Sequence, residues 1–202
     1  MNGPTLRPTL ARVKAKFEDP TEEIKGKKIE LCKTKNKGLP GQFLEKLLGI
    51  PTSSATLDCS DGEVKLFPLK KLKSGEYVPK ETIAITMSGL NSKNINNPDS
   101  WEFSSLYKKT ANMLFISYIR ENDTITYMNS YLFDKNNIIF DTFVDDYKCI
   151  TEHYKVNGIR NKGNTINGRY IQGRTKGAGG EKKTVAFYFR NQQFVKNIVM
   201  NL

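Results

Sequence analysis

Residues 56–67, Thr-Leu-Asp-Cys-Ser-Asp-Gly-Glu-Val-Lys-Leu-Phe, decide how the rest of the chain is interpreted. The pair Asp61-Gly62 is a strong signal for a two-residue β-hairpin turn, because glycine tolerates the positive φ that such turns require. Short apolar runs lie on both sides of this pair and predict strands over residues 55–59 and 62–69. The stretch therefore predicts a β-hairpin.

The predicted hairpin brings two acidic side chains and one amine to the same face. A turn centred on the Asp-Gly pair places Asp58 opposite Lys65, and a turn one residue earlier places Asp58 opposite Glu63. Directly opposed residues share a face and lie about 5 Å apart. In both registers Asp58, Glu63 and Lys65 therefore converge, while Val64 and Leu66 point the other way, into a core.

This combination of side chains is typical of phosphate chemistry. Carboxylates are the hard oxygen ligands that Mg²⁺ prefers, and Mg²⁺ usually acts together with phosphate groups. A neighbouring amine orients a water molecule or neutralises negative charge that develops on the phosphate. The alternative is a solvated strand with an ion pair, since Glu-x-Lys also occurs at Glu23-Lys25 and Glu181-Lys183. The aspartate on the partner strand and the apolar residues behind it favour a site.

Composition restricts the class of protein. The chain has 202 residues, of which 38% are hydrophobic, so it is long enough for one domain with a sizeable core. It has no 18-residue apolar run and no signal-peptide core, so we expect no membrane contact and a cytoplasmic protein. Cys32, Cys59 and Cys149 are odd in number and lack metal-ligand spacing, which favours reduced thiols. The single histidine, His153, excludes His-rich zinc sites and most His-based triads.

The positive charge is concentrated near the C-terminus. The formal net charge is +11. From Lys155 onward ten Lys or Arg residues are opposed only by Glu181, so this part carries +9 and the first 154 residues carry +2. Such asymmetry indicates a polyanionic partner, and the glycine and aromatic residues between the charges favour nucleic acid. The alternative is a generally basic protein with a solvated tail.

Hydrophobic periodicity predicts a mixture of helices and strands. Residues 40–49 form the clearest helix, with an apolar stripe that includes Phe43 and Leu47 and with Gly49 as its C-cap. The glycine-rich basic stretch 173–180 is expected to be a flexible loop whose glycines let the backbone approach a ligand closely, and it does not match a phosphate-binding P-loop. Further helices are expected near residues 8–17, 20–23, 145–155 and 190–202, and either a short helix or an ordered loop at 101–109. Further strands are expected at 81–87, 111–119, 124–133, 138–143, 169–172 and 184–189.

Several short blocks, in order along the chain, resemble the MutH endonucleases, a family that includes a mismatch-repair nicking enzyme and related type II restriction enzymes that cut at GATC. The first block, Gly-Gln-Phe-Leu-Glu-Lys-Leu-Leu-Gly at 41–49, is similar to the family's first helix of the active site. The second, Gly-Glu-Val-Lys-Leu-Phe-Pro at 62–68, is similar to its Gly-Val-Glu-Leu-Lys-x-x-Pro strand. The other similar segments are Lys70–Tyr77, Trp101–Ser104 followed by Lys109, Arg174–Ala178 and Ala186–Arg190.

The resemblance implies a fold and a domain organisation. The expected fold is α/β (α+β) and restriction-endonuclease-like, with a mixed central sheet flanked by helices and two lobes around a DNA cleft. Residues 1–202 would form a single endonuclease domain. In that domain approximately 1–109 would be the catalytic lobe, and approximately 110–202 would hold the remaining sheet and a basic lobe that reads DNA.

The resemblance also implies roles for individual residues. Asp58 and Glu63 would bind the metal ion, Glu45 would be the acidic residue of the preceding helix, and Lys65 would position or activate the attacking water. Lys109 would be an accessory lysine. The family usually has two more residues between the Asp and the Glu, so Asp61 stays an alternative ligand to Asp58. The residues expected to contact DNA are Arg174, Lys176, Tyr188 and Arg190.

Together these features predict a Mg²⁺-dependent, sequence-specific DNA endonuclease, specifically a type II restriction enzyme acting at a GATC-like site in double-stranded DNA. A MutH-like repair nickase, which would need a partner ATPase, is one alternative. A basic nucleic-acid-binding protein without catalysis is the other. A symmetric double cut requires either a homodimer on the DNA or two successive nicks, and the sequence leaves both open.

Overall fold

A computed structural model describes residues 6–31, 36, 38–86, 100–157, 165–176 and 184–202. The chain divides into two compact units. The first unit comprises Met1–Glu81 and Asn112–Phe133, and the second comprises Thr82–Ala111 and Asp134–Leu202. The division near residue 109 and the two-lobed arrangement around a DNA cleft stay predictions.

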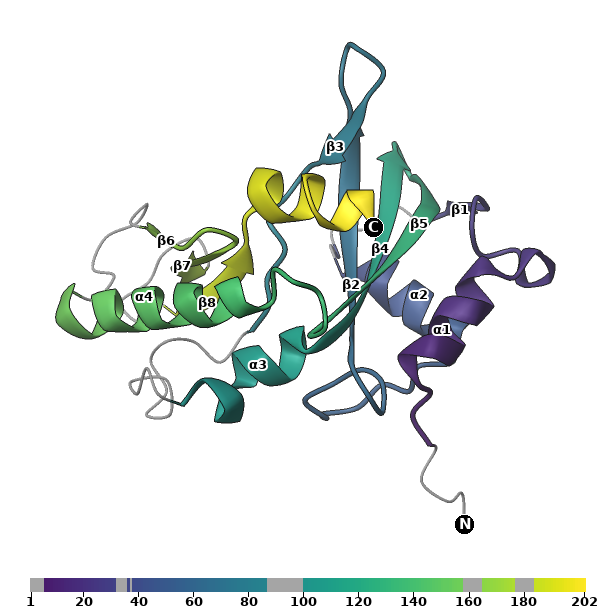
Figure 1. Cartoon of the computed structure of the whole chain (residues 1–202). Helices are drawn as coiled ribbons and strands as arrows, with labels where there is room; N and C mark the ends of the chain where they lie inside the picture. Colours follow the sequence, from purple (N-terminus) through teal and green to yellow (C-terminus); the bar gives the residue numbers. More distant parts are fainter. Residues whose placement is uncertain (1–5, 32–35, 37, 87–99, 158–164, 177–183) are drawn as a thin grey trace. The chain divides into compact units, whose positions relative to one another are not determined.

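The first unit contains a mixed β-sheet. Within the described residues it has five strands, in the order β1-β5-β4-β2-β3 (Figure 1). Strand β2 is parallel to β4, with Glu63 opposite Met113, and antiparallel to β3. The α+β class with a mixed central sheet is thus confirmed. The strand bounds are β1 Lys28–Glu30, β2 Glu63–Lys71, β3 Tyr77–Pro79, β4 Asn112–Glu121 and β5 Thr124–Asp134.

Helices α1 (Leu10–Glu18) and α2 (Leu39–Leu48) cover one face of this sheet. Their apolar stripes pack on the inward-facing residues of β4 and β5, where burial of each large side chain contributes roughly 1.5–3 kcal/mol. Val64 and Leu66 pack against the same cluster, as predicted, so Glu63 and Lys65 lie on the opposite face of β2. The buried members of this core include Leu10, Val13, Phe17, Leu44, Leu48, Leu114, Ile116, Ile125 and Tyr127.

Helix α2 is fixed at both of its ends. The hydroxyl of Tyr127 donates to the carbonyl of Pro40 at 2.6 Å, which holds the first turn against β5. Gly49 has a φ of +74° and its N–H donates to the carbonyls of Glu45 and Lys46, so the predicted glycine C-cap is confirmed. The position of Glu45 is therefore set by a helix with little freedom to shift.

The predicted β-hairpin is wrong. Residues 55–59 form no strand, and β2 begins at Glu63 with β4 and β3 as its partners. Gly62 is not one of the described glycines with a positive φ. Its missing side chain serves a close approach instead, because a Cβ there would collide with the carbonyl oxygen of Asn112 and with Leu10.

The second unit combines helices with an antiparallel sheet. In its described part, strands β6 (Thr165–Asn167), β7 (Ile171–Lys176) and β8 (Thr184–Phe189) lie in that order. Its core is aromatic; the rings of Phe189 and Phe194, for example, are stacked with centroids 4.5 Å apart. Its helices are η2 Trp101–Phe103, α3 Ser105–Thr110, α4 Asp141–Asn157, the π-helical η3 Asn191–Lys196 and η4 Val199–Asn201, and the first unit adds η1 Pro20–Glu22.

Some of the other predicted elements differ from the structure. The strand expected at 138–143 is wrong, since Asn137 accepts from the N–H of Ile139 through its side chain, closing a turn before α4 begins at Asp141. In the 81–87 segment Ala84 forms an isolated bridge to Tyr188 in place of a strand, and Met87 lies outside the described residues. The glycine-rich stretch is partly strand, because β7 continues to Lys176, and residues 177–180 are likewise outside the described residues.

No helix in the described ranges is long and apolar enough to cross a membrane.

Candidate active site

The first residue of β2 is a buried acid. Glu63 is 2% exposed, and the Nζ of Lys65 lies 2.7 Å from its Oε1. The two residues are separated by one position in a strand, so their side chains leave the same face. Because burying an acidic side chain is costly without a positive partner, the ammonium of Lys65 offsets part of the cost of burying Glu63.

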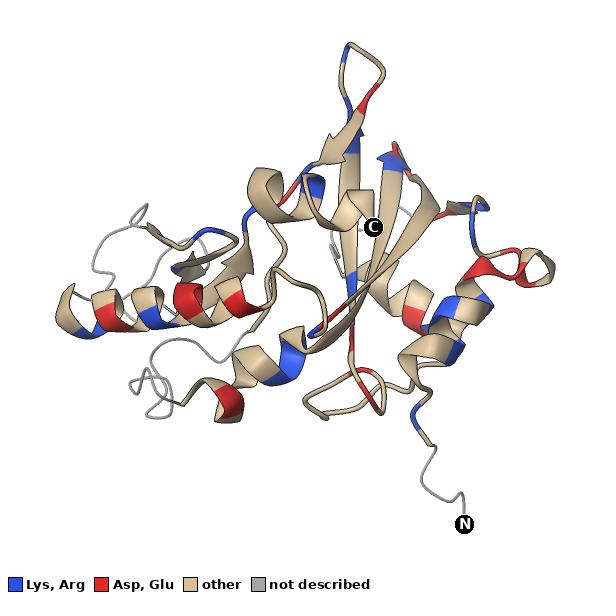
Figure 2. Ribbon diagram, in the orientation of Figure 1, with Lys and Arg blue, Asp and Glu red and all other residues tan. Residues whose placement is uncertain are grey.

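Asp58 reaches the same strand end from a turn. Its Oδ2 accepts the backbone N–H of Val64 at 3.0 Å. The turn is closed by the N–H of Cys59, which donates to the carbonyl of Gly62 at 2.9 Å. A turn rather than a second strand thus brings Asp58 to the residue that follows Glu63, and their shared role as metal ligands stays a prediction. Figure 2 shows the acidic residues along the loop before β2 and at the start of the strand, with a basic residue following on β2.

Negative charge is concentrated around this turn. Burial, together with the charges of Asp58, Asp61 and Glu63, raises the pKa of the Cys59 thiol to about 12. Burial and then the charge of Asp58 raise the pKa of the Glu45 carboxyl above its ordinary value. Glu45 on α2 is thus close enough to Asp58 for the two carboxylates to repel each other. A cation between the carboxylates would relieve this repulsion.

Asp61 is engaged in a different contact. Its Oδ1 accepts the backbone N–H of Leu10 at 2.8 Å, which satisfies a donor at the beginning of helix α1. Its backbone carbonyl accepts from the side-chain amide of Asn112 at 3.0 Å. Each aspartate thus has one oxygen bound to a backbone N–H, but Asp61 is oriented toward helix α1, whereas Asp58 is oriented toward β2 and its charge also acts on Glu45. Asp58 is therefore the better candidate ligand.

The residues at the start of β2 are chemically suited to bind a magnesium ion. Among the residues that the structure describes, no group of three or more His, Cys, Asp or Glu side chains is arranged to hold a metal ion. Mg²⁺, however, usually takes one or two protein carboxylates and completes its octahedron with water and substrate phosphate. Asp58 and Glu63 supply two such carboxylates, and the excess negative charge around Cys59 favours a divalent cation.

The remaining residues of the predicted site lie in the second unit. Lys109 is in the last turn of α3. The guanidinium of Arg174 on β7 lies over the ring of Tyr188 on β8, 4.2 Å from its centroid. Lys176 ends β7. Arg190 donates to the carbonyl of Gly168 at 2.7 Å, so part of its guanidinium holds a turn of the protein itself.

Sequence reasoning missed the residue that organises this turn. The buried carboxylate of Asp146 accepts the N–H groups of Arg169, Tyr170 and Ile171, while burial raises its pKa and these hydrogen bonds oppose the shift. A Cβ at Gly168 would collide with Asp146. No local motif marks Asp146, because its partners lie more than 20 residues away in the sequence. The exposed Arg169 guanidinium, over the ring of Tyr170 at 5.2 Å, is held in place by the same turn.

Two of three comparisons relate this chain to known proteins. The family model described as "DNA mismatch repair enzyme MutH" matches residues 51–151, a range that includes Asp58, Glu63, Lys65 and Lys109. A similar solved structure is the restriction endonuclease MvaI in complex with its cognate DNA substrate, at 18% identity, a TM-score of 0.42, and coverage of 83% of this chain and 87% of that chain. No curated protein sequence matches.

Proposed function

The chain belongs to the MutH family of DNA mismatch repair enzymes and is a DNA endonuclease; we propose that it cleaves double-stranded DNA with Mg²⁺ at the start of strand β2. The observation that carries the proposal is that Asp58 accepts the N–H of the residue after Glu63 at the start of β2, with the Lys65 ammonium 2.7 Å from Glu63. Two carboxylates beside a lysine combine metal binding with a positive group for the attacking water.

In this proposal Asp58 and Glu63 hold the ion, and Glu45 binds a second ion or its water. When bound, Mg²⁺ supplies Lewis acidity that polarises a non-bridging phosphate oxygen and stabilises the leaving 3′ oxygen. Glu45 fits the accessory role because burial and the charge of Asp58 raise the pKa of its carboxyl, and a nearby cation would oppose this shift.

Lys65 is proposed to act on the water that attacks phosphorus. Its ammonium is held by Glu63 and only partly exposed, with 17% of its side-chain surface accessible, so its charge is weakly screened by solvent. It lowers the cost of forming hydroxide and of the negative charge that develops on the phosphate. Lys109 is proposed to assist as an accessory lysine, an assignment that rests on the family resemblance.

The second unit is proposed to bind and read the DNA. Arg190, Lys176 and the exposed Arg169 supply positive charge for phosphate contacts, which position the duplex. Arg174 and Tyr188 present a guanidinium stacked on a ring, and arginine prefers guanine edges in the major groove. This agrees with a G-containing site, and the GATC-like sequence follows from the resemblance.

Among enzymes of this kind we propose a type II restriction endonuclease in a single domain, acting as a homodimer on DNA or by two successive nicks. A repair nickase that depends on a partner ATPase is the second candidate, since the matching family model is that of a mismatch repair enzyme. A non-catalytic DNA-binding protein is the third, and it requires the carboxylates to be structural.

One digestion separates these candidates. Unmethylated supercoiled plasmid is incubated with the protein, with and without Mg²⁺, and the ends of the products are sequenced. Linear fragments with constant ends support restriction, and nicked circles support a repair nickase. Salt-sensitive binding without any Mg²⁺-dependent product would overturn the endonuclease mechanism.

A further inference from the structure

We propose that the N-terminal segment, residues 7–10, holds the loop that carries Asp58 in its metal-binding conformation, and that Arg7 is a positioning residue for Asp58. The inference rests on the proposed metal site. Arg7 belongs to none of the blocks that carry the family resemblance, and it lies outside the range matched by the family model. The argument comes from the hydrogen bonds that join two segments about 50 residues apart in the sequence.

Arg7 fixes the peptide that precedes Asp58. Its Nη1 donates to the carbonyl oxygen of Leu57 at 2.8 Å, and the Arg7 side chain is half-buried. The peptide unit that contains this carbonyl is planar and includes the N and Cα of Asp58. Holding the oxygen therefore restricts both atoms at once. A hydrogen bond from a charged guanidinium is also stronger than one between neutral groups.

The other side of the loop is held by the residues that follow Arg7. The N–H of Ser60 donates to the carbonyl of Pro8 at 2.9 Å. The N–H of Leu10 donates to Oδ1 of Asp61 at 2.8 Å. Leu10 is 1% exposed and begins helix α1, which is anchored in the core. The loop is thus fastened on both sides of Asp58 to a segment that is itself fixed by a helix.

The loop needs such fastening because of its own charge. Asp58, Asp61 and Glu63 lie within six residues of one another, around a turn closed by the Cys59 N–H and the Gly62 carbonyl, so their carboxylates repel one another before a cation binds. Residues 55–59 form no strand that would resist this repulsion. A metal ligand must be held close to its productive position by surrounding contacts, or its affinity for the ion falls.

The charge of Arg7 and its positioning role have opposite effects on metal binding. The guanidinium of Arg7 donates to the carbonyl of Leu57, the residue before Asp58, so its positive charge lies close to the acidic side chains. By Coulomb's law alone, removing this positive charge would strengthen the binding of a divalent cation. Loss of positioning would weaken it. The sign of the change therefore distinguishes the two roles.

The test is Mn²⁺ binding by the full chain, measured from the electron paramagnetic resonance signal of free Mn²⁺. We expect Arg7→Met to weaken Mn²⁺ binding by about tenfold, the lower end of the range for partners that orient metal ligands. Arg7→Lys keeps one donor for the Leu57 carbonyl, so its affinity for Mn²⁺ should fall less. The Mg²⁺ concentration for half-maximal plasmid cleavage should rise in the same order.

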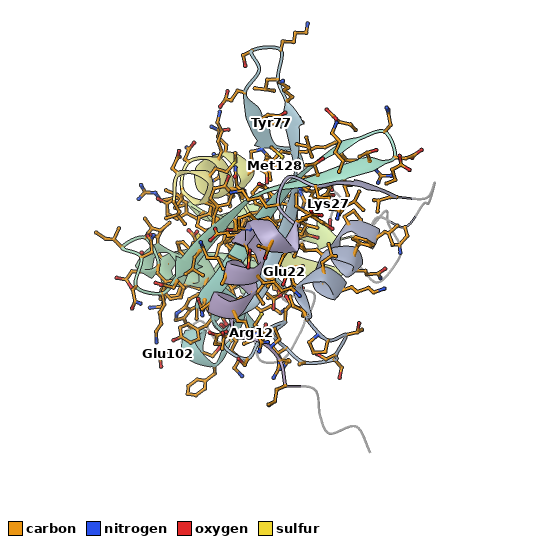
Figure 3. The ribbon with its side chains drawn as sticks, turned by 90° about the vertical axis from the view of Figure 1, so that its right-hand side faces the viewer. Arg12, Glu22, Lys27, Tyr77, Glu102 and Met128 are labelled. Atoms are coloured by element: carbon orange, nitrogen blue, oxygen red, sulfur yellow. The ribbon has the colours of Figure 1, made fainter. Side chains whose placement is uncertain are left out.

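Arg12→Met is the matched control. Arg12 is an exposed arginine of α1, labelled in Figure 3, where α1 lies in front of the mixed sheet. The substitution removes the same charge five residues further along the chain but leaves the hydrogen bond from Arg7 to the Leu57 carbonyl in place. We therefore expect Mn²⁺ affinity to stay at the wild-type value.

Amide hydrogen exchange separates local release of the loop from general destabilisation. In Arg7→Met the N–H groups of Cys59 and Val64, which close the turn and hold Asp58, should exchange faster, while that of Leu48 in α2 should not. Equal acceleration at all three would overturn the inference, as would an Arg7→Met protein that binds Mn²⁺ as tightly as the wild type or more tightly. A wild-type protein that neither binds Mn²⁺ nor cuts DNA would instead overturn the proposed function, and this inference with it.

Discussion

At the scale of single residues, the proposed chemistry depends on which side chains lie at the start of β2 and on what else each of them contacts. Glu63 and Lys65 are paired at 2.7 Å with little exposure. Asp58 is oriented by the N–H of Val64, whereas Asp61 is oriented by the N–H of Leu10. The two aspartates are three positions apart in the sequence, yet Asp58 belongs to the proposed metal site and Asp61 to the beginning of helix α1.

Lys65→Ala should abolish DNA cleavage. The substitution removes the positive charge beside the attacking water and leaves Glu63 buried without the ammonium that now neutralises it. DNA affinity, measured by fluorescence anisotropy in Ca²⁺, should stay within about threefold, since one phosphate contact among many contributes little. Lys27→Ala, at an exposed lysine paired with Glu23, is the control and should cleave normally. Wild-type cleavage by Lys65→Ala would remove Lys65 from the mechanism.

The pair Asp58→Asn and Asp61→Asn should resolve which aspartate binds the metal ion. Asparagine keeps an oxygen that accepts the Leu10 N–H, so Asp61→Asn should retain cleavage and stability near the wild-type level. Asp58→Asn removes a charged ligand and should raise the required Mg²⁺ concentration by at least about tenfold. Activity assays over a Mg²⁺ series compare the two variants directly. The opposite ranking would make Asp61 the ligand.

At the scale of secondary-structure elements, the sequence predicted the locally encoded parts. The apolar stripe and Gly49 predicted α2, and continuous or alternating apolar residues predicted β4, β5 and β8, because side-chain period and capping are properties of neighbours in the sequence. The same reasoning predicted that Val64 and Leu66 face the core, away from Glu63 and Lys65.

The hairpin prediction failed because a glycine has two distinct uses. The Asp61-Gly62 pair predicted a positive φ, yet Gly62 serves the close approach of β2 to Asn112. The parallel pairing of β2 with β4 joins residues about 50 positions apart, and no local signal specifies it. Arg7 and Asp146 were missed for the same reason, since each acts on backbone groups distant in the sequence.

Gly62→Ala should therefore destabilise the first unit. The added Cβ collides with a backbone carbonyl, which cannot move as a flexible side chain does, and overpacking of this kind costs typically 1–3 kcal/mol. Gly41→Ala is the matched control: a Cβ there meets no described atom within 4 Å, and in a helix alanine is favoured over glycine by roughly 0.5–1 kcal/mol. Urea unfolding should show the two variants shifted in opposite directions. An unchanged midpoint for Gly62→Ala would refute the close-approach argument.

At the scale of the whole molecule, the distribution of charge links stability, pH and metal binding. The C-terminal part of the chain is strongly basic, while the start of β2 gathers carboxylates that repel one another. DNA and a divalent cation would each neutralise one of these concentrations of charge. The stability of the folded chain should therefore rise when either ligand binds. Because carboxylates are charged only at higher pH, the stabilisation by the cation should increase as the pH rises.

A carboxyl whose pKa is raised by folding keeps its proton in the folded state at pH values where the unfolded chain has lost it. For Glu45 the contribution to stability is therefore present in acid and falls as the pH rises above the ordinary value of 4.5. The pKa of Asp146 is also raised, but its cause is burial in the second unit, where its carboxylate already accepts three backbone N–H groups. Added Mg²⁺ should counter the loss of stability that arises at Glu45 and leave the loss that arises at Asp146 unchanged.

The melting temperature should consequently rise more on addition of Mg²⁺ at pH 7.5 than at pH 5. With Mg²⁺ at about 100 times its dissociation constant, the increase at pH 7.5 should be roughly 5–10 °C. Glu45→Gln removes the repelling charge, so without Mg²⁺ it should melt above the wild type at pH 7.5 and gain less from the ion. Glu22→Gln, at an exposed glutamate labelled in Figure 3, is the matched control and should follow the wild type. Equal Mg²⁺ shifts at both pH values, or in Glu45→Gln and the wild type, would show that the repulsion at Glu45 is not coupled to the ion.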